Sequence, residues 1–169
     1  MKHLWAPWRL AYILADSAKG EECILCAFPA PGRARFRDHL ILCQAPHAFV
    51  MMNKYPYNNG HVMVIPRRHA SDPEQLSEAE YMGTMDLLRR ATKAIRTAMS
   101  PHGFNVGMNL GRVAGAGIDS HCHYHIVPRW NGDTNFMPVL GETKVMGDHL
   151  VTSYERLLPF FAPLGEGPE

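Results

Sequence analysis

Short apolar runs alternate with turn-forming residues through the middle of the chain. Each run has six to eight residues, which is the length of a β-strand, and Gly, Pro, Asn or Asp residues lie between most of them. The pattern predicts five strands, at His39–Gln44, Ala48–Asn53, His61–Pro66, Phe104–Leu110 and His121–Pro128. The first two are separated by Ala45-Pro46-His47, which is short enough for a hairpin.

A helical periodicity follows the third run. The sequence Ser77-Glu78-Ala79-Glu80 is that of a capping box, in which the first and last side chains satisfy backbone N–H groups at a helix start. Apolar residues then recur at three- and four-residue spacings, at Leu88, Ala91, Ile95 and Met99, and Pro101 and Gly103 end the pattern. This predicts one long helix, and Asp148–Phe160 predicts a shorter one. The order of elements is typical of an α+β domain with a mostly antiparallel sheet.

Composition and charge narrow the class of protein. The chain has 169 residues, a length typical of one domain, and its hydrophobic content of 46% is ordinary for a globular protein. Its 17 basic and 16 acidic residues argue against a nucleic-acid binder with a broad basic surface. No apolar run approaches the roughly 20 residues that span a bilayer, and the amino terminus lacks the apolar stretch of a signal peptide. We therefore expect a cytoplasmic protein without a membrane or nucleic-acid partner, and its four cysteines suit a reducing compartment.

The strongest chemical signal is the run His121-Cys122-His123-Tyr124-His125. Side chains of a strand alternate between its faces, so the three histidines are expected to share one face. Three imidazoles in a row can act as nucleophile, acid and ligand around a group of the size of a phosphate. Arg129 follows shortly after as a further candidate contact for an anion.

Two other interpretations of this run stay open at this point. It is compatible with a polar edge strand that happens to carry histidines, since the chain has ten of them. It is also compatible with a three-histidine metal site of the kind that holds catalytic zinc. Strict alternation with apolar or small residues favours a functional site, whichever of the two chemistries it serves.

A second motif lies near the amino terminus, where Cys23-Ile24-Leu25-Cys26 is a lone CxxC. Two ligands do not close a tetrahedral metal site, and the βαβ context of a redox CxxC is missing. Two histidines would complete a metal site, and His69 and His121 are candidates among ten. Spacing alone does not choose between them.

The histidine run and its surroundings resemble the histidine-triad (HIT) superfamily, whose signature is His-x-His-x-His followed by two apolar residues. His121–Val127 reads HCHYHIV, Phe49–His69 resembles the nucleotide-binding hairpin of the family, and His102–Gly111 resembles the strand and glycine turn before the triad. The flanking segments LWAPWR and PRWNGDTNF are similar to the bacterial branch that contains diadenosine tetraphosphate phosphorylases.

The resemblance implies a fold and an assembly. We expect a single HIT domain over residues 1–169, with a core at about 22–136, an N-terminal extension at 1–21 and a C-terminal helix and tail at 137–169. The fold would be α+β, a five-stranded antiparallel sheet with one long helix and a shorter C-terminal helix. The family further implies a homodimer in which the sheet continues across the interface.

The resemblance also implies an activity, the phosphorolysis or hydrolysis of dinucleoside polyphosphates. His123 would attack the α-phosphate and form a nucleotidyl-histidine, and His125 would contact the phosphate and help the leaving group. His61 would be a further active-site histidine. Contacts to the nucleotide are implied for four more residues, with Asn53 at the ribose and Asn109 at the phosphates, together with Phe49 and Gly117.

A structural zinc ion is implied in the same way. Zinc-bearing relatives, among them galactose-1-phosphate uridylyltransferases, use a CxxC, a histidine just after the third strand and the first histidine of the triad. Carried onto this chain, the ligands are Cys23, Cys26, His69 and His121. Such a site would clamp the amino-terminal segment onto the triad strand.

The chain departs from the family in the segment before the triad. Many members carry Gly-Gln-Ser or Gly-Gln-Thr there, whereas Ala114–Ser120 reads AGAGIDS and has no hydroxyl at the usual position. Backbone donors of a glycine-rich turn can still hold an anion. Two alternative functions therefore stand beside the first: a nucleoside phosphoramidase with the same nucleophile, and a zinc-stabilised nucleotide-binding module with little turnover.

Overall fold

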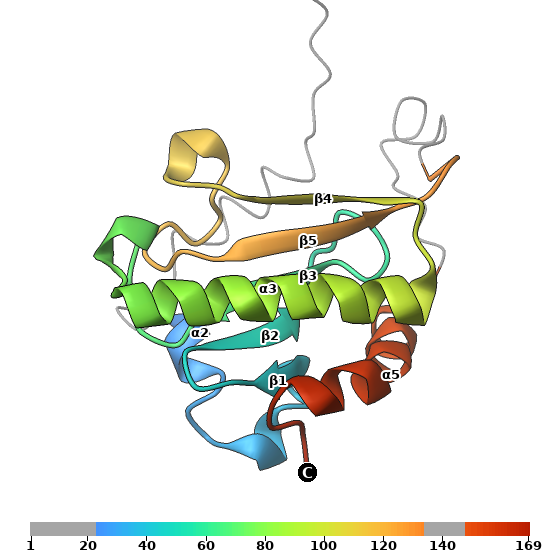
Figure 1. Ribbon diagram of the computed structural model, residues 1–169, viewed down its shortest axis with the longest axis horizontal. Coiled ribbons are helices and arrows are strands. Elements are labelled where there is room, and N and C mark those ends of the chain that lie inside the picture. Colours follow the sequence, from blue (N-terminus) through green and yellow to red (C-terminus); the bar gives the residue numbers. More distant parts are fainter. Residues whose placement is uncertain (1–22, 134–147) are drawn as a thin grey trace, which may run out of the picture.

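The computed structural model describes residues 23–133 and 148–169. Five strands form one sheet in the order β1-β2-β3-β5-β4, and each neighbouring pair is antiparallel (Figure 1). Their bounds are β1 Ile41–Gln44, β2 Ala48–Met52, β3 Val62–Pro66, β4 Gly103–Met108 and β5 Tyr124–Arg129. The α+β class and the hairpin between the first two strands are confirmed. The predicted N-terminal extension and the stretch 134–147 lie outside the described residues.

The long helix α3, Glu78–Met99, begins at the predicted capping box. The backbone N–H of Glu80 donates to the Ser77 hydroxyl, and the N–H of Ser77 donates to the Glu80 carboxylate at 2.8 Å. A second helix, α5 Leu150–Phe161, starts two residues later than the pattern predicts. The remaining helical elements are short: α2 Ile24–Ala27 and the 3-10 turns Arg33–Arg35, Pro73–Gln75, Arg112–Ala114 and Ala162–Leu164. Within the described residues no helix is long and apolar enough to cross a membrane.

The larger part of the core lies between one face of the sheet and the helices α3 and α5, which both lie in front of the sheet in Figure 1. Alternate residues of β2 and β3 point to this side, among them Val50, Met52, Val62 and Val64, and they pack against Leu87, Ala91 and Ile95 of α3. All of these side chains are buried. The apolar stripe predicted for the helix is therefore its core-facing side.

The opposite face of the sheet carries a second, smaller core cluster. Its strand residues are Ile41, Phe49, Met51, Met63 and Ile65, and Leu25 of α2 and Phe36 complete it. Cross-strand partners share a face, and Met63 is paired with His125 of β5. The chemistry-bearing histidine therefore lies on this second face, away from α3.

The predicted fifth strand begins too early. His121 and His123 precede β5, whose pairing with β3 starts at Tyr124 opposite Val64. The N–H of Cys122 donates instead to the carbonyl of Ala70 at 2.7 Å. Because the backbone leaves the sheet here, the expectation that all three histidines share one face of a strand is wrong, and only His125 lies within β5.

Candidate active site

Three histidines meet beside β3 and β5 on the face of the sheet away from α3: His61 immediately precedes β3, His123 precedes β5, and His125 lies in β5 opposite Met63. The rings of His61 and His125 lie 5.1 Å apart, and those of His123 and His125 lie 4.9 Å apart in an edge-on arrangement. His61 is fully buried and His123 is 5% exposed. The structure thus brings the three residues predicted to be catalytic into one cluster.

A chain of hydrogen bonds runs through this cluster from the loop between β2 and β3. The backbone N–H of Tyr57 donates to Nδ1 of His61 at 3.0 Å, and Nε2 of His61 lies 2.9 Å from Nδ1 of His125. The Tyr57 ring is stacked on His61 with 4.8 Å between the centroids. A backbone amide only donates, so it determines the proton position on the neutral His61.

The consequence for His125 follows directly. His61 accepts at Nδ1, so in its neutral form it carries its proton on Nε2 and donates to Nδ1 of His125. A neutral His125 then carries its own proton on Nε2. It is therefore a donor at that atom, which suits a group that protonates a leaving oxygen.

His123 is fixed in the opposite tautomer. Its Nδ1 lies 2.8 Å from the carbonyl oxygen of His121, and a carbonyl only accepts, so Nδ1 carries the proton. Nε2 of the neutral ring then holds a lone pair, as a nucleophile requires. Burial lowers the pKa of His123 below its usual value, although the hydrogen bond to His121 opposes the shift, so the neutral form prevails at neutral pH.

A second cluster lies beside the first and contains the two cysteines of the CxxC. The ligand atoms of Cys23, Cys26, His69 and His121 all lie within 4.8 Å of one another. Nδ1 of His121 lies 3.4 Å from the sulfur of Cys23, and Nδ1 of His69 lies 3.3 Å from that of Cys26. Two sulfurs and two imidazole nitrogens are a donor set that suits tetrahedral zinc.

The backbone orients His121 toward the sulfurs. Its Nε2 lies 2.9 Å from the carbonyl oxygen of Pro66, to which it donates, and this leaves Nδ1 as the ligand atom. His121 is fully buried, and burial lowers its pKa, which favours the neutral form that a metal needs. His69 is the exposed member of the cluster.

The residues predicted to contact the nucleotide differ in their placement. Asn53 follows β2 on the face of His125, and its Oδ1 accepts from the N–H of Tyr55 at 2.8 Å. Asn109 and Gly117 are half-buried in the segment that precedes the triad, where the Asn109 amide donates to the Gly115 carbonyl. Phe49 is fully buried in the second core cluster, so any contribution it makes to nucleotide binding is indirect, through the packing of this face.

Two residues that the sequence did not indicate, Asn58 and Asp133, interact near the C-terminal end of β5. Arg129, predicted as an anion contact, instead donates through Nε and Nη2 to the two carboxylate oxygens of Asp133, at 2.7 and 2.9 Å. The same carboxylate accepts from the side chain of Asn58 at 2.8 Å. An ion pair four residues apart is readable from sequence, but its link to Asn58, 75 positions away, is not.

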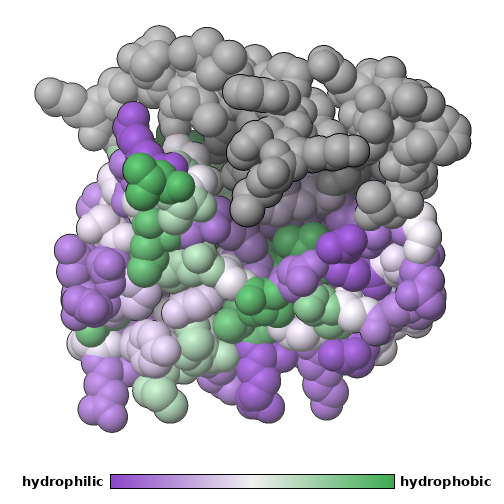
Figure 2. Space-filling view, turned by 90° about the horizontal axis from the view of Figure 1, so that it is seen from above, coloured by the Kyte–Doolittle hydropathy of each residue, from purple (hydrophilic) through white to green (hydrophobic). Residues whose placement is uncertain are grey.

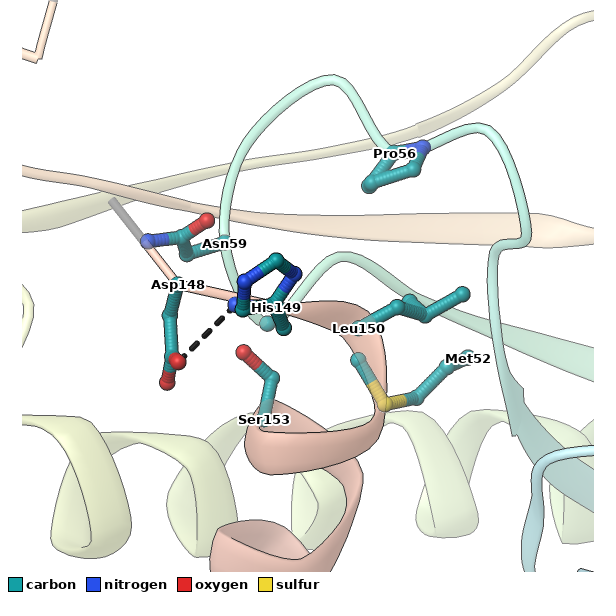
Figure 3. Close-up of a pocket in the computed structure, with 8 residues that line it drawn as sticks. Met52, Pro56, Asn59, Asp148, His149, Leu150 and Ser153 are labelled. Carbon is teal, nitrogen blue, oxygen red and sulfur yellow. Dashed lines mark hydrogen bonds between the residues drawn. The ribbon is translucent and has the colours of Figure 1, made fainter. Parts of the chain in front are cut away.

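A cavity of about 230 Å³ lies between the loop that joins β2 to β3 and the start of α5 (Figure 3). It is lined by Met52, Pro56, Asn59, Gly60, Asp148, His149, Leu150 and Ser153. None of the clustered histidines lines it. The cavity is therefore separate from the candidate chemistry.

Comparisons with known proteins show the family and the fold of the chain. The model of the HIT domain matches residues 36–132. The chain is 36% identical over 163 residues to a Mycobacterium tuberculosis protein named AP-4-A phosphorylase, covering 94% of this chain and 83% of that protein. It is 33% identical over 90 residues to an adenosine 5'-monophosphoramidase of Schizosaccharomyces pombe, covering 53% of this chain and 64% of that protein.

Solved structures share the fold. A zinc-bound histidine triad family protein from Mycobacterium smegmatis superimposes with a TM-score of 0.65 at 23% identity, covering 85% of this chain and 95% of that one. A structure named as a uridylyltransferase superimposes with a TM-score of 0.67 at 14% identity and covers 95% of this chain and 52% of that one.

Proposed function

The chain belongs to the HIT domain family, and we propose that it is an enzyme that transfers the nucleotidyl group of a dinucleoside polyphosphate by way of His123. The observation that carries the proposal is the pair of opposite tautomers in one cluster. His123 holds a lone pair at Nε2, and His125 beside it holds a proton at Nε2. One ring is ready to attack phosphorus and the other to protonate an oxygen.

The proposed reaction has two steps, written here for diadenosine tetraphosphate. Nε2 of His123 attacks the α-phosphorus, a P–N bond forms and the bridging P–O bond breaks, which releases ATP. His125 donates its Nε2 proton toward the leaving oxygen. An acceptor then attacks the adenylyl-histidine and breaks the P–N bond: inorganic phosphate gives ADP, and water gives AMP.

Phosphate is the acceptor that we favour, because the relative named AP-4-A phosphorylase is 36% identical across 94% of this chain. The experiment is incubation with diadenosine tetraphosphate in the presence and absence of phosphate, followed by chromatography. We expect ATP and ADP with phosphate. ATP and AMP at the same rate in both conditions would make the enzyme a hydrolase, and no turnover of any adenylyl compound would contradict the proposal.

A second candidate is the phosphoramidase reaction, in which the same His123 attacks a phosphorus–nitrogen bond. The monophosphoramidase relative favours it, at 33% identity over 53% of this chain. Adenosine 5'-phosphoramidate in the same assay separates the two, since the preferred substrate is the one with the higher kcat/KM. A nucleotide-binding module would bind both compounds and convert neither.

We further propose that Cys23, Cys26, His69 and His121 hold a structural zinc ion. Two thiolates and two neutral imidazoles fit this ion in number, type and mutual distance. The ion would tie α2 and the segment after β3 to the backbone of His121. Since the carbonyl of His121 accepts from His123, the site would hold the nucleophile in orientation.

We also propose one domain over the whole chain and a homodimer formed along β4. This strand lies at the edge of the sheet and pairs there with β5, and its Val106 is 48% exposed. Exposed edge strands favour pairing with another chain. Figure 2, which looks onto this edge, shows hydrophobic groups among hydrophilic ones, and Leu110 and Val113 are also exposed nearby. The molar mass of the protein in solution tests this proposal, and we expect twice the 19.0 kDa of one chain.

A further inference from the structure

Asp133 follows β5 and is bonded to the last residue of that strand, to its own turn and to the loop between β2 and β3. Its carboxylate accepts two hydrogen bonds from Arg129, one from the backbone N–H of Trp130 at 3.1 Å and one from the Asn58 amide at 2.8 Å. Nη1 of Arg129 reaches across to Asn105 of β4 at 2.9 Å. The carboxylate is 11% exposed, so these charge-assisted bonds are partly shielded from water.

Asn58 is the point at which this arrangement holds the loop between β2 and β3. Its side-chain Nδ2 donates both to Asp133 and to the carbonyl of Pro128 at 3.0 Å. Its backbone carbonyl accepts from the N–H of His61 at 3.2 Å. The neighbouring residue is Tyr57, whose N–H bonds Nδ1 of His61. The loop is thus tied to β5 at the residue next to the amide that selects the His61 tautomer.

We propose that Asp133 is a positioning residue for the acid of the reaction, acting through Asn58, Tyr57 and His61 on His125. The role of His125 as the acid in this proposal rests on the proposed function. With the loop tied down, the Tyr57 amide meets Nδ1 of His61, and the protons of His61 and His125 both reside on Nε2. The ion pair at the end of β5 therefore determines which atom of His125 presents a proton to the leaving oxygen.

Release of the loop has a defined chemical result. Without the Tyr57 N–H at Nδ1, a neutral His61 is free to carry its proton on Nδ1, and its Nε2 lone pair then faces Nδ1 of His125. Two acceptors facing each other repel, so His125 shifts its own proton to Nδ1 and loses the donor at Nε2. Attack by His123 is unaffected, because its tautomer depends on the carbonyl of His121.

The test uses two variants that cut the tie from opposite sides. Asn58→Ala removes the loop side and leaves the Arg129–Asp133 pair, and Asp133→Ala removes the carboxylate. Asn131→Ala is the matched control, since this exposed residue of the same turn bonds His102 through its backbone N–H. Circular dichroism and thermal melting of the metal-loaded protein establish folding, and Asp133→Asn, which removes the charge and keeps the size of the side chain, replaces Asp133→Ala if that variant does not fold.

The deciding readout is the ¹⁵N spectrum of the histidine side chains near pH 8, where an unperturbed imidazole of pKa about 6.5 is neutral. We expect single Nε2–H tautomers for His61 and His125 in the wild type and mixed tautomers in both variants. We also expect kcat to fall roughly tenfold with KM nearly unchanged, which is less than the factor of about 10² to 10⁴ that a positioned acid contributes, because mixed tautomers keep part of the donor at Nε2.

Unchanged tautomers in the folded variants would overturn the proposal, even if activity fell, because the residues would then be structural only. Mixed tautomers with wild-type kcat would overturn it as well. If the wild type converts no dinucleoside polyphosphate, the proposed function fails separately. Loss of the single tautomers in the variants would then still assign the loop tie to Asp133.

Discussion

Two neighbouring clusters use the same short backbone segment in opposite ways. In the proposed metal cluster, Cys23, Cys26, His69 and His121, the Pro66 carbonyl accepts from Nε2 of His121 and leaves Nδ1 to face the sulfurs. In the proposed catalytic cluster, His61, His123 and His125, the His121 carbonyl accepts from Nδ1 of His123 and leaves a lone pair on Nε2. Two histidines two positions apart are therefore set to present different ring nitrogens to different partners.

The backbone, rather than the histidine pattern, determines which ring nitrogen each histidine presents. Pro66 lies in β3 beyond its pairing with β5, and His121 precedes β5, so both carbonyls accept from histidine side chains rather than from the neighbouring strand. The two clusters share a single atom group, the peptide of His121. Disturbing each cluster separately measures how far they depend on one another.

The largest effect is expected from His123→Ala. Loss of the proposed nucleophile should lower kcat for diadenosine tetraphosphate by a factor of at least about 10⁴, since removal of a nucleophile leaves only binding and electrostatic catalysis. Binding of the substrate, measured by calorimetry, and the zinc content should stay near wild type.

The control for this variant is His47→Ala, which removes an exposed imidazole at the turn between β1 and β2. It should retain full turnover. Substantial turnover in His123→Ala would move the nucleophile to another residue, and loss of zinc in the same variant would show that the two clusters are one unit.

The next effect is expected from Cys23→Ser, which removes a thiolate from the metal cluster. Zinc content and melting temperature should fall together, because a thousandfold weaker zinc affinity takes away about 4 kcal/mol of linked stability. Turnover should fall less than in His123→Ala, since the nucleophile remains and only its backbone support is loosened.

Cys122→Ser is the matched control for the cysteine change. Cys122 is buried next to His121, but it is not among the residues of the metal cluster. Elemental analysis should find zinc in this variant and little in Cys23→Ser. Equal zinc in the two variants would contradict the ligand assignment.

Periodicity predicted the fold well because burial follows it directly. The stripe on α3 and the apolar runs of β2 and β3 are the residues that fill the core. The predicted start of β5 was wrong, since no feature of the local sequence distinguishes a residue that pairs in the sheet from one whose backbone bonds elsewhere. The tertiary structure determines whether the N–H of Cys122 donates to a neighbouring strand or to the Ala70 carbonyl.

The candidate site was predictable in its residues but not in its proton arrangement. The histidine run and the CxxC are visible as motifs, and resemblance to a family groups their ligands. The Tyr57 amide and the Asn58–Asp133 bond leave no trace in the sequence pattern, because a backbone donor has no residue type and the bond spans 75 positions. Arg129 is a further example, since its position near the motif predicted a contact to an anionic ligand, whereas it donates to Asp133.

The smallest effect is expected from His69→Gln, which weakens the metal cluster on the side away from the nucleophile. His69 is exposed, and its ring lies edge-on to that of His121 with 5.1 Å between the centroids. Cys23, Cys26 and His121 would still hold the proposed ion, and water would supply the fourth ligand, as in zinc sites with three protein ligands. A chelator competition should show weaker zinc binding, while kcat in excess zinc should stay within about twofold of wild type. If kcat fell in step with zinc affinity, His69 would be acting on His123 through the metal, and the separation of the two clusters would be wrong; if kcat holds, only the peptide of His121 joins them.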